Sequence, residues 1–346
     1  MIPPQGRTTI MTGIMTTTKV ITMTTVSIAL MLALSTSSVY AAQDNAYHHE
    51  AEIGFLDSDD GGDGIFNANY RYYFNAVEQA DKPYALADFF HQGSKVAVRY
   101  STSDFDDIYA LSGQYVFDSN WFINAEVSQV DFEEYEYSTT LDSFTIYAVN
   151  LGYFFTDHSA LTLGYSTMSE SKAANFTSAS YNSEGYYSND FDAFRLTYEH
   201  FIPLQSTVGV MLTGTLAYSD EQYSNHFLNS DTNDQGQVTN SNSGQNITYD
   251  RYNVAINADW YINNSWSVGA VIEQGNTDTH YNFSSANYDD VGSIDQTDTS
   301  TSINTRYTWR FADIFSAKFS LSHSNFDGEY ENDSQTNFSV GVNARF

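Results

Sequence analysis

A period-two alternation of apolar and polar residues recurs from one end of this chain to the other, and it constrains the fold more than any other feature. Successive side chains of a β-strand point to opposite faces, so this period predicts strands rather than helices. After Leu34, no apolar run approaches the roughly 20 residues that a membrane-spanning helix needs. The clearest alternating stretch places the following residues on one face: Val208, Val210, Leu212, Gly214, Leu216 and Tyr218.

Fourteen segments of this kind are predicted as strands, each close to the roughly 9–11 residues with which a tilted strand crosses a bilayer. They lie at 46–56, 65–74, 95–101, 108–117, 121–131, 143–155, 160–168, 192–202, 207–219, 249–261, 266–275, 300–311, 316–325 and 336–346.

The connections alternate between short ones, such as 118–120 and 263–265, and long polar ones at 169–190, 220–248 and 275–298. Short turns at one end and long loops at the other are typical of an outer-membrane barrel. The sequence therefore predicts an all-β fold, an antiparallel transmembrane β-barrel of about 14 strands with short periplasmic turns and long extracellular loops. The stretch 75–94 is an exception, because it is long where a short periplasmic turn is expected. It could hold a short helix, fold inward and narrow the lumen, or hide two strands of a sixteen-stranded barrel.

The first residues have the character of an export signal. Arg7 and Lys19 precede a short apolar stretch, 26–34, and small residues that suit cleavage after Ala41. Such a leader is too short to span a membrane. We expect a signal peptide at 1–41, with Met1 or Met15 as its start, and a single mature domain at 42–346. Export through this leader and the barrel pattern predict the cell outer membrane as the location.

The charge of the chain excludes one class of partner and indicates where the charged side chains lie. The formal net charge is −30, which excludes nucleic acid as a natural partner because phosphate binding needs a basic surface. If the apolar face of each strand faces lipid, most basic residues face the lumen, together with a smaller set of acids. The predicted pore-lining residues are Arg71, Lys95, Arg99, Arg195, Arg251, Arg306, Arg310, Lys318, Arg345, Glu50, Glu52, Glu126, Glu199, Asp259 and Glu273. Six of the basic residues come from strands that become neighbours when the barrel closes: Arg71, Lys95, Arg306, Arg310, Lys318 and Arg345. They could form a basic arc that faces acids across a pore, or wall ion pairs that only make the lumen polar.

The chain ends in an alternating strand with a terminal aromatic residue. Closing this strand on the first one removes the sheet edge, so we expect pairing with Glu50–Phe55. Its lipid face is also predicted to be an assembly signal, formed by Phe338, Val340, Val342, Ala344 and Phe346. Further aromatic residues at the short-turn ends, such as Trp121, Trp260 and Trp266, predict a girdle at the lipid–water boundary.

The sequence contains no recognisable set of residues for catalysis or for binding a cofactor. His48, His49 and Glu50 lack a further metal ligand, and His200 and His323 lack a placed partner. We therefore expect no enzyme, no metal and no cofactor. The acidic connections could bind divalent cations that bridge lipopolysaccharide phosphates.

The leader, "NANYRYYF" (67–74), "DKPYALADFFHQGSKVAVRY" (81–100) and the aromatic-terminated last strand resemble the general porin family of Gram-negative, especially marine-type, bacteria. The resemblance implies passive diffusion of small polar solutes and ions, contact with outer-membrane lipid and lipopolysaccharide, and recognition by the barrel-assembly machinery through the C-terminal strand. The connection 133–142 is short for a loop folded into the pore, so a monomer and a homo-oligomer both stay open. The rival readings are a non-conducting structural or adhesive barrel and an outer-membrane hydrolase.

Overall fold

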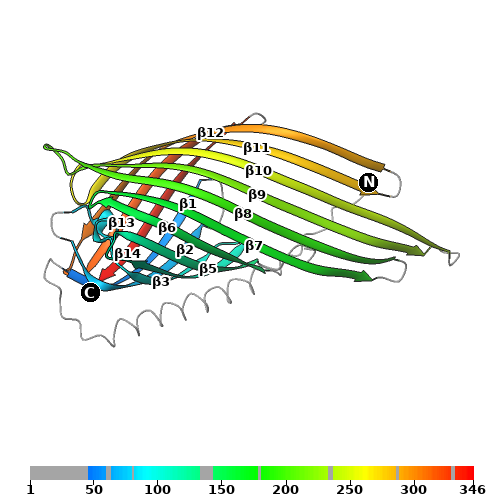
Figure 1. Cartoon of the computed structure of the whole chain (residues 1–346), viewed down its shortest axis with the longest axis horizontal. Coiled ribbons are helices and arrows are strands. Elements are labelled where there is room, and N and C mark those ends of the chain that lie inside the picture. The colour runs from blue at the N-terminus through cyan, green and yellow to red at the C-terminus, as the bar shows by residue number, and fades with distance from the viewer. Residues whose placement is uncertain are drawn as a thin grey trace, which may run out of the picture. The chain divides into compact units, whose positions relative to one another are not determined.

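The chain folds into a closed antiparallel β-barrel, in which fourteen strands of the described residues pair in sequence order (Figure 1). The computed structural model describes residues 46–59, 64–79, 82–132, 143–177, 181–232, 237–285, 288–328 and 332–346. The predicted fold and strand number are confirmed, and the sixteen-stranded alternative is wrong because the ring closes with fourteen. The predicted signal peptide lies outside the described residues. Within them, no helix is long and apolar enough to cross a membrane.

The strands fall into two length classes. Eight strands have 8 to 14 residues: β1 (Ala46–Ser58), β2 (Ile65–Glu78), β3 (Lys95–Thr102), β4 (Asp106–Val116), β5 (Trp121–Phe132), β6 (Ser143–Thr156), β13 (Phe315–Gly328) and β14 (Asn332–Arg345). Six consecutive strands have 19 to 24 residues: β7 (Ser159–Thr177), β8 (Tyr181–Pro203), β9 (Gly209–Thr232), β10 (Val238–Tyr261), β11 (Trp266–Ser285) and β12 (Tyr288–Arg310). Figure 1 shows these long strands continuing as a curved sheet beyond the ends of the others.

The long strands correct the predicted strand boundaries. Most of 169–190, 220–248 and 275–298, expected as irregular loops, is paired strand. The apolar alternation ends where the lipid-facing surface ends, but the cross-strand pairing does not. A sheet in water needs no lipid-compatible face, so its strands leave no period-two hydrophobic signal.

The outward face of the barrel carries an apolar band with aromatic residues at both edges. On β10 these are Trp260 at one edge and Tyr252 at the other, with the exposed side chains of Val254 and Ile256 between them. Eight residues at about 3.3 Å each, tilted by about 40°, span roughly 20 Å, close to the roughly 25 Å band of outer-membrane barrels. The barrel is therefore of the transmembrane type.

Beyond the edge of the apolar band that Tyr252 forms, a row of carboxylates crosses the sheet. Tyr165, Phe194, Tyr218 and Tyr252 lie in cross-strand register, or one pairing step apart, on β7 to β10. Two residues further along the strands, away from the band, the residues in register on β8 to β12 are Asp192, Asp220, Asp250, Asp278 and Asp295. Because ionised carboxylates are costly in hydrocarbon, this row lies in water. We call this end of the barrel the loop side. The opposite end, where β4–β5, β6–β7, β8–β9, β10–β11 and β12–β13 are joined, is the turn side.

The last strand closes the barrel as expected. β14 pairs with β1 from Glu50–Arg345 to Ser58–Asn337. The pairing continues to the final residue: the Phe346 amide donates to the His49 carbonyl at 3.0 Å, and the His49 amide donates to the Phe346 carbonyl at 2.8 Å. The Phe346 ring stacks on His49 with centroids 5.1 Å apart. Phe338, Val340 and Val342 are exposed on the outward face, whereas Ala344 is buried.

Deleting Phe346 removes its three backbone hydrogen bonds, two with His49 and one from the His48 amide, together with the ring, so we expect the fraction of heat-modifiable folded barrel to fall severalfold. Phe346→Ala keeps the backbone pairing and loses only the stacking, and a smaller loss is expected. The measurement is the mobility shift of unheated against heated protein after expression and after refolding in vitro. Normal assembly of the deletion variant would show that the terminal residue is not an assembly signal.

Candidate functional site: the lumen and its inserted segment

The stretch between β2 and β3 folds into the barrel instead of forming a turn. Its ordered core is a 3-10 turn, η1 (Tyr84–Leu86), followed by the short helix α2 (Ala87–His91). We call residues 82–94 the inserted segment. The predictions of a short helix and of an inward fold are both confirmed.

Apolar side chains of the inserted segment pack on lumenal side chains from several walls. Ala87 lies in a buried cluster with Tyr47, Tyr73 and Val77 of β1 and β2. Phe89 packs against a second cluster on β5 to β7, formed by Phe122, Phe154 and Ala160. Leu86, Phe89 and Phe90 pack against a third cluster on β8 to β10, formed by Phe201, Met211 and Tyr261. Since these clusters lie on different parts of the ring, the segment spans the mouth on the turn side.

Polar contacts fix the segment at its margins. The Tyr84 amide donates to the carbonyl of Asn264, in the turn between β10 and β11, at 2.9 Å. The Gln92 side chain donates to the Thr156 carbonyl at the end of β6 at 3.0 Å. Lys95 at the start of β3 forms a 2.5 Å ion pair with Asp88. The segment is thereby joined to walls on opposite sides of the lumen.

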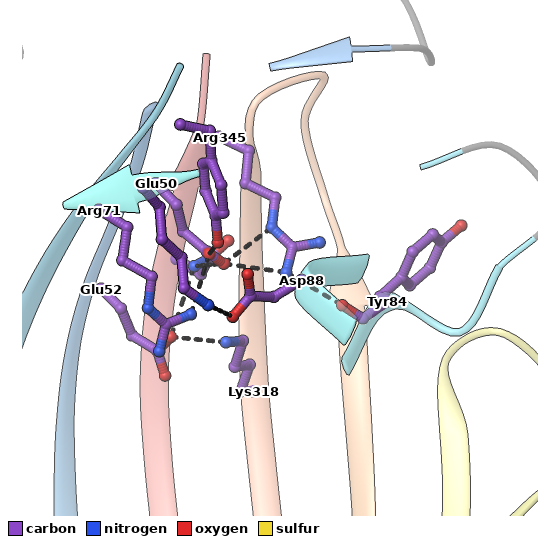
Figure 2. Close-up of polar contacts among 10 residues, drawn as sticks. Glu50, Glu52, Arg71, Tyr84, Asp88, Lys318 and Arg345 are labelled. Atoms are coloured by element: carbon purple, nitrogen blue, oxygen red, sulfur yellow. Dashed lines mark hydrogen bonds and ion pairs between the residues drawn. The ribbon is translucent and has the colours of Figure 1, made fainter. Parts of the chain in front are cut away.

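Glu50 is the centre of a buried polar network beside this segment (Figure 2). Its Oε2 accepts hydrogen bonds from Arg71 Nη1 and Tyr73 Oη, each at 3.1 Å. Its Oε1 accepts from Asn343 Nδ2 and Arg345 Nε, each at 2.9 Å. Only 3% of the Glu50 side chain is exposed, so the two cations and two neutral donors replace the water that the carboxylate lost.

Arg345 carries the network from the wall to the inserted segment. Its Nη2 donates to the Tyr84 carbonyl at 3.0 Å. Its guanidinium also lies 5.1 Å from the centroid of the Tyr47 ring. One side chain therefore links the closing strand, the first strand and the segment in the lumen, as Figure 2 shows.

Removing one partner of this network should be costly. For Arg345→Met we expect the free energy of unfolding to fall by about 3 kcal/mol, because Glu50 loses a buried counter-charge. Lys318→Met is the matched control: its 2.6 Å pair with Glu52 is about a quarter exposed, so a loss of at most about 1 kcal/mol is expected. Urea unfolding in phospholipid vesicles, followed by tryptophan fluorescence, measures both. Equal losses for the two variants would contradict the central role of Glu50.

Several of the remaining predicted lumenal residues have partners within the described residues. Arg99 pairs with Glu126 at 3.3 Å, and Arg306 lies 3.7 Å from buried Asp259. Arg310 lies over the Tyr84 ring, 5.2 Å from its centroid. Glu199 is half-buried, opposite Ala160 and Thr213. Most of the basic arc therefore consists of cations that meet acids or aromatic rings in the wall.

The loop-side half of the lumen holds an open polar space of about 580 Å³. It is bordered by Glu126, Arg195, Arg251 and Glu273 among the predicted residues, together with amides such as Asn150. Small side chains leave the room for it: Ala148, Gly164, Ser166, Ala193, Ala217, Ser219 and Ala255. The lumen is thus filled on the turn side, and it is open and polar toward the loop side.

His91 ends α2 in a half-buried position. Its ring meets Tyr73 edge to face with centroids 5.5 Å apart, and it lies directly against Gly93, where a Cβ would collide with it. Its Nε2 is buried without a hydrogen-bond partner in the described residues. Burial is the main cause that lowers the pKa of His91. Asp88 opposes this shift, and Lys95, Lys82 and His48 add to it.

Acid should therefore loosen the inserted segment. A His whose pKa is lowered in the folded state stabilises that state above its ordinary pKa of about 6.5, and this contribution is lost as the pH falls through that value. We expect cleavage within 82–94 by an acid-tolerant protease to rise severalfold from pH 8 to pH 5, with the barrel intact. His91→Phe keeps a ring and cannot titrate, so its cleavage should not depend on pH in this way. The same pH response in both proteins would exclude His91 as the cause.

Sequence reasoning missed several residues of this site. Leu86, Phe89 and Phe90 lie in a stretch without strand period, and nothing in their spacing shows which wall they contact. Tyr73 and Asn343 were passed over because they carry no charge. One feature of the sequence could have indicated the lumenal clusters: Phe122, Phe154 and Phe201 are aromatic residues at positions that the register assigns to the lumen.

The histidines considered for catalysis or metal binding are not brought into a constellation. His323 Nδ1 contacts Thr336 Oγ1 at 3.1 Å, and His200 stacks on Tyr198. His49 contacts the Tyr70 hydroxyl at 2.7 Å. Among the described residues, no group of three or more His, Cys, Asp and Glu side chains could hold a metal ion.

Comparison with known proteins gives loose likenesses of shape. No protein-family model and no curated protein matches the chain. The outer membrane protein Omp33 of Acinetobacter baumannii is 14% identical, with a TM-score of 0.45 over 88% of this chain and 100% of that one. OmpT, an outer membrane protein of Vibrio cholerae, is 11% identical, with a TM-score of 0.43 over 90% and 100%. The ferric citrate transporter FecA is 9% identical, with a TM-score of 0.42 over 82% and 45%. The fold described above rests on the strand pairing, not on these likenesses.

Proposed function

We propose that this protein is an outer-membrane diffusion channel, a porin, for small polar solutes and ions. The turn side faces the periplasm and the loop side faces the exterior. The observation that carries the proposal is the polar lumenal space of about 580 Å³ inside a closed barrel whose outer surface is apolar. A polar interior behind a lipid-compatible wall is the arrangement that lets water-soluble molecules cross a membrane.

The inserted segment sets the narrowest point of this pathway. It packs on lumenal clusters of β1 and β2, of β5 to β7 and of β8 to β10, and Arg345 holds it from the closing strand. Small ions pass its margins, where Asp88, Lys95 and Gln92 supply polar groups. Larger solutes pass when the segment is displaced. Lipid and lipopolysaccharide contact the outward face, the barrel-assembly machinery recognises the C-terminal strand, and the function requires no catalysis, metal or cofactor.

A non-conducting structural or adhesive barrel is the second candidate, because two observations favour it. The inserted segment fills the turn-side mouth, and β7 to β12 continue as a sheet beyond the apolar band. On β10 the residues from Val238 to Asp250 lie outside the band, about 40 Å of strand at about 3.3 Å per residue. Such a sheet could bind a surface outside the cell.

Planar lipid bilayers distinguish the two candidates. We expect the refolded, heat-modifiable protein to give discrete conductance steps, small for a barrel of this size because the inserted segment narrows it. Protein heated before addition is the control and should give none. A folded protein that inserts and stays silent would contradict the channel and favour the adhesive barrel.

Shortening the inserted segment should widen the pathway. We expect replacement of residues 80–93 by a short Gly–Ser turn to raise the single-channel conductance severalfold, since it empties the turn-side mouth. A Gly–Ser replacement of the external connection 133–142 is the control and should leave the conductance within about twofold. An unchanged conductance in the shortened variant would show that the segment does not limit passage.

A further inference from the structure

Two lumenal arginines differ from most other basic residues of the wall. Arg71, Lys95, Arg99, Lys318 and Arg345 each lie within 3.3 Å of a carboxylate oxygen. Arg195 has no hydrogen bond or ion pair within the described ranges, and Arg251 donates there to the Thr277 hydroxyl at 3.2 Å. Both side chains are exposed, and both border the open lumenal space. They present uncompensated positive charge to whatever enters it.

The strand register brings these two arginines to one place. Arg195 of β8 lies opposite Ala217 of β9, which lies opposite Asn253 of β10. Arg251 precedes Asn253 by two residues, so it is on the same face, with Ser219 of β9 opposite it. Only the small side chains of Ala217 and Ser219 stand between the two arginines on β9. Two arginine side chains, each long enough to reach about 6 Å, can therefore converge on one anion.

A carboxylate on the strand next to β10 borders the same space. Glu273 of β11 pairs with Ala255 of β10 and accepts a 2.5 Å hydrogen bond from Asn253 Nδ2, a neutral donor. Within the described residues no cation pairs with it. Glu126, the other acid at the border, is compensated by Arg99 at 3.3 Å. The space thus offers two guanidinium groups and one carboxylate that have no oppositely charged partner within the described residues.

We propose that this space is a binding site for a small zwitterion, such as an amino acid or a dipeptide, on its way through the lumen. The solute carboxylate binds between Arg195 and Arg251, whose planar forks match its geometry. The solute ammonium group binds Glu273. A volume of about 580 Å³ lies in the range of small-molecule sites, about 300–1,000 Å³. This inference rests on the proposed function, because the solute must enter the lumen.

Binding is measured on the folded wild-type protein in detergent micelles by saturation-transfer NMR, with glycylglycine, acetate and N-acetylglycinamide as probes. We expect binding to weaken in that order, since the three probes carry two, one and no charges. Arg195→Gln combined with Arg251→Gln should weaken glycylglycine binding at least tenfold. The matched control, Arg306→Gln combined with Lys318→Gln, also removes two lumenal cations and should change it less than twofold.

Glu273→Gln separates a zwitterion site from a plain anion site. It should weaken glycylglycine binding severalfold and leave acetate binding unchanged or stronger. Equal affinity for the three probes, or equal effects of the two double substitutions, would overturn the proposal. Because binding is measured without any flux through the lumen, a negative binding result refutes the binding site and does not bear on the proposed channel function. A silent protein that binds glycylglycine in this pattern would refute only diffusion, and a conducting one that does not would refute only this site.

Discussion

The carboxylate of Glu50 joins parts of the chain that are almost three hundred residues apart in the sequence. It accepts hydrogen bonds from Arg71 on β2 and from Asn343 and Arg345 on β14, so the first, second and last strands meet on one buried charge. A buried carboxylate is tolerated only when its partners are complete. Correct closure of the barrel supplies them, since the register that pairs Glu50 with Arg345 also brings Asn343 within reach.

The same network determines the shape of the lumen. Arg345 holds the inserted segment through the Tyr84 carbonyl, and the segment then finds apolar partners on the walls across the lumen. The turn-side half of the lumen is consequently packed and aromatic. The loop-side half is lined by small residues and carries Arg195, Arg251 and Glu273, which have no oppositely charged partner within the described residues. In the proposed channel, a solute from outside would meet a charged, roomy compartment before it reaches the narrow mouth, an order that suits selection before passage.

The sequence predicted the parts of the fold that lipid imposes. Alternation with an apolar face is required wherever a strand contacts hydrocarbon, so all fourteen strands and the closing register of β14 on β1 could be inferred. Where water replaces lipid the requirement ends, and the outer halves of β7 to β12 left no signal. The lumenal charges could be assigned by parity. Their partners could not, because the pairing of Lys318 with Glu52, or of Lys95 with Asp88, depends on strand register and on an inserted helix.

Under the proposed function, the inserted segment controls passage through the turn-side mouth. The chain contains no cysteine, so Tyr84→Cys with Arg310→Cys introduces a unique pair where the two side chains are in contact. A reducible bifunctional maleimide across this pair would hold the segment against β12, and the conductance of one channel can be recorded before and after reductant is added. We expect only the smallest conductance steps while the segment is held, and larger openings after reduction. Identical conductance before and after reduction would contradict the account.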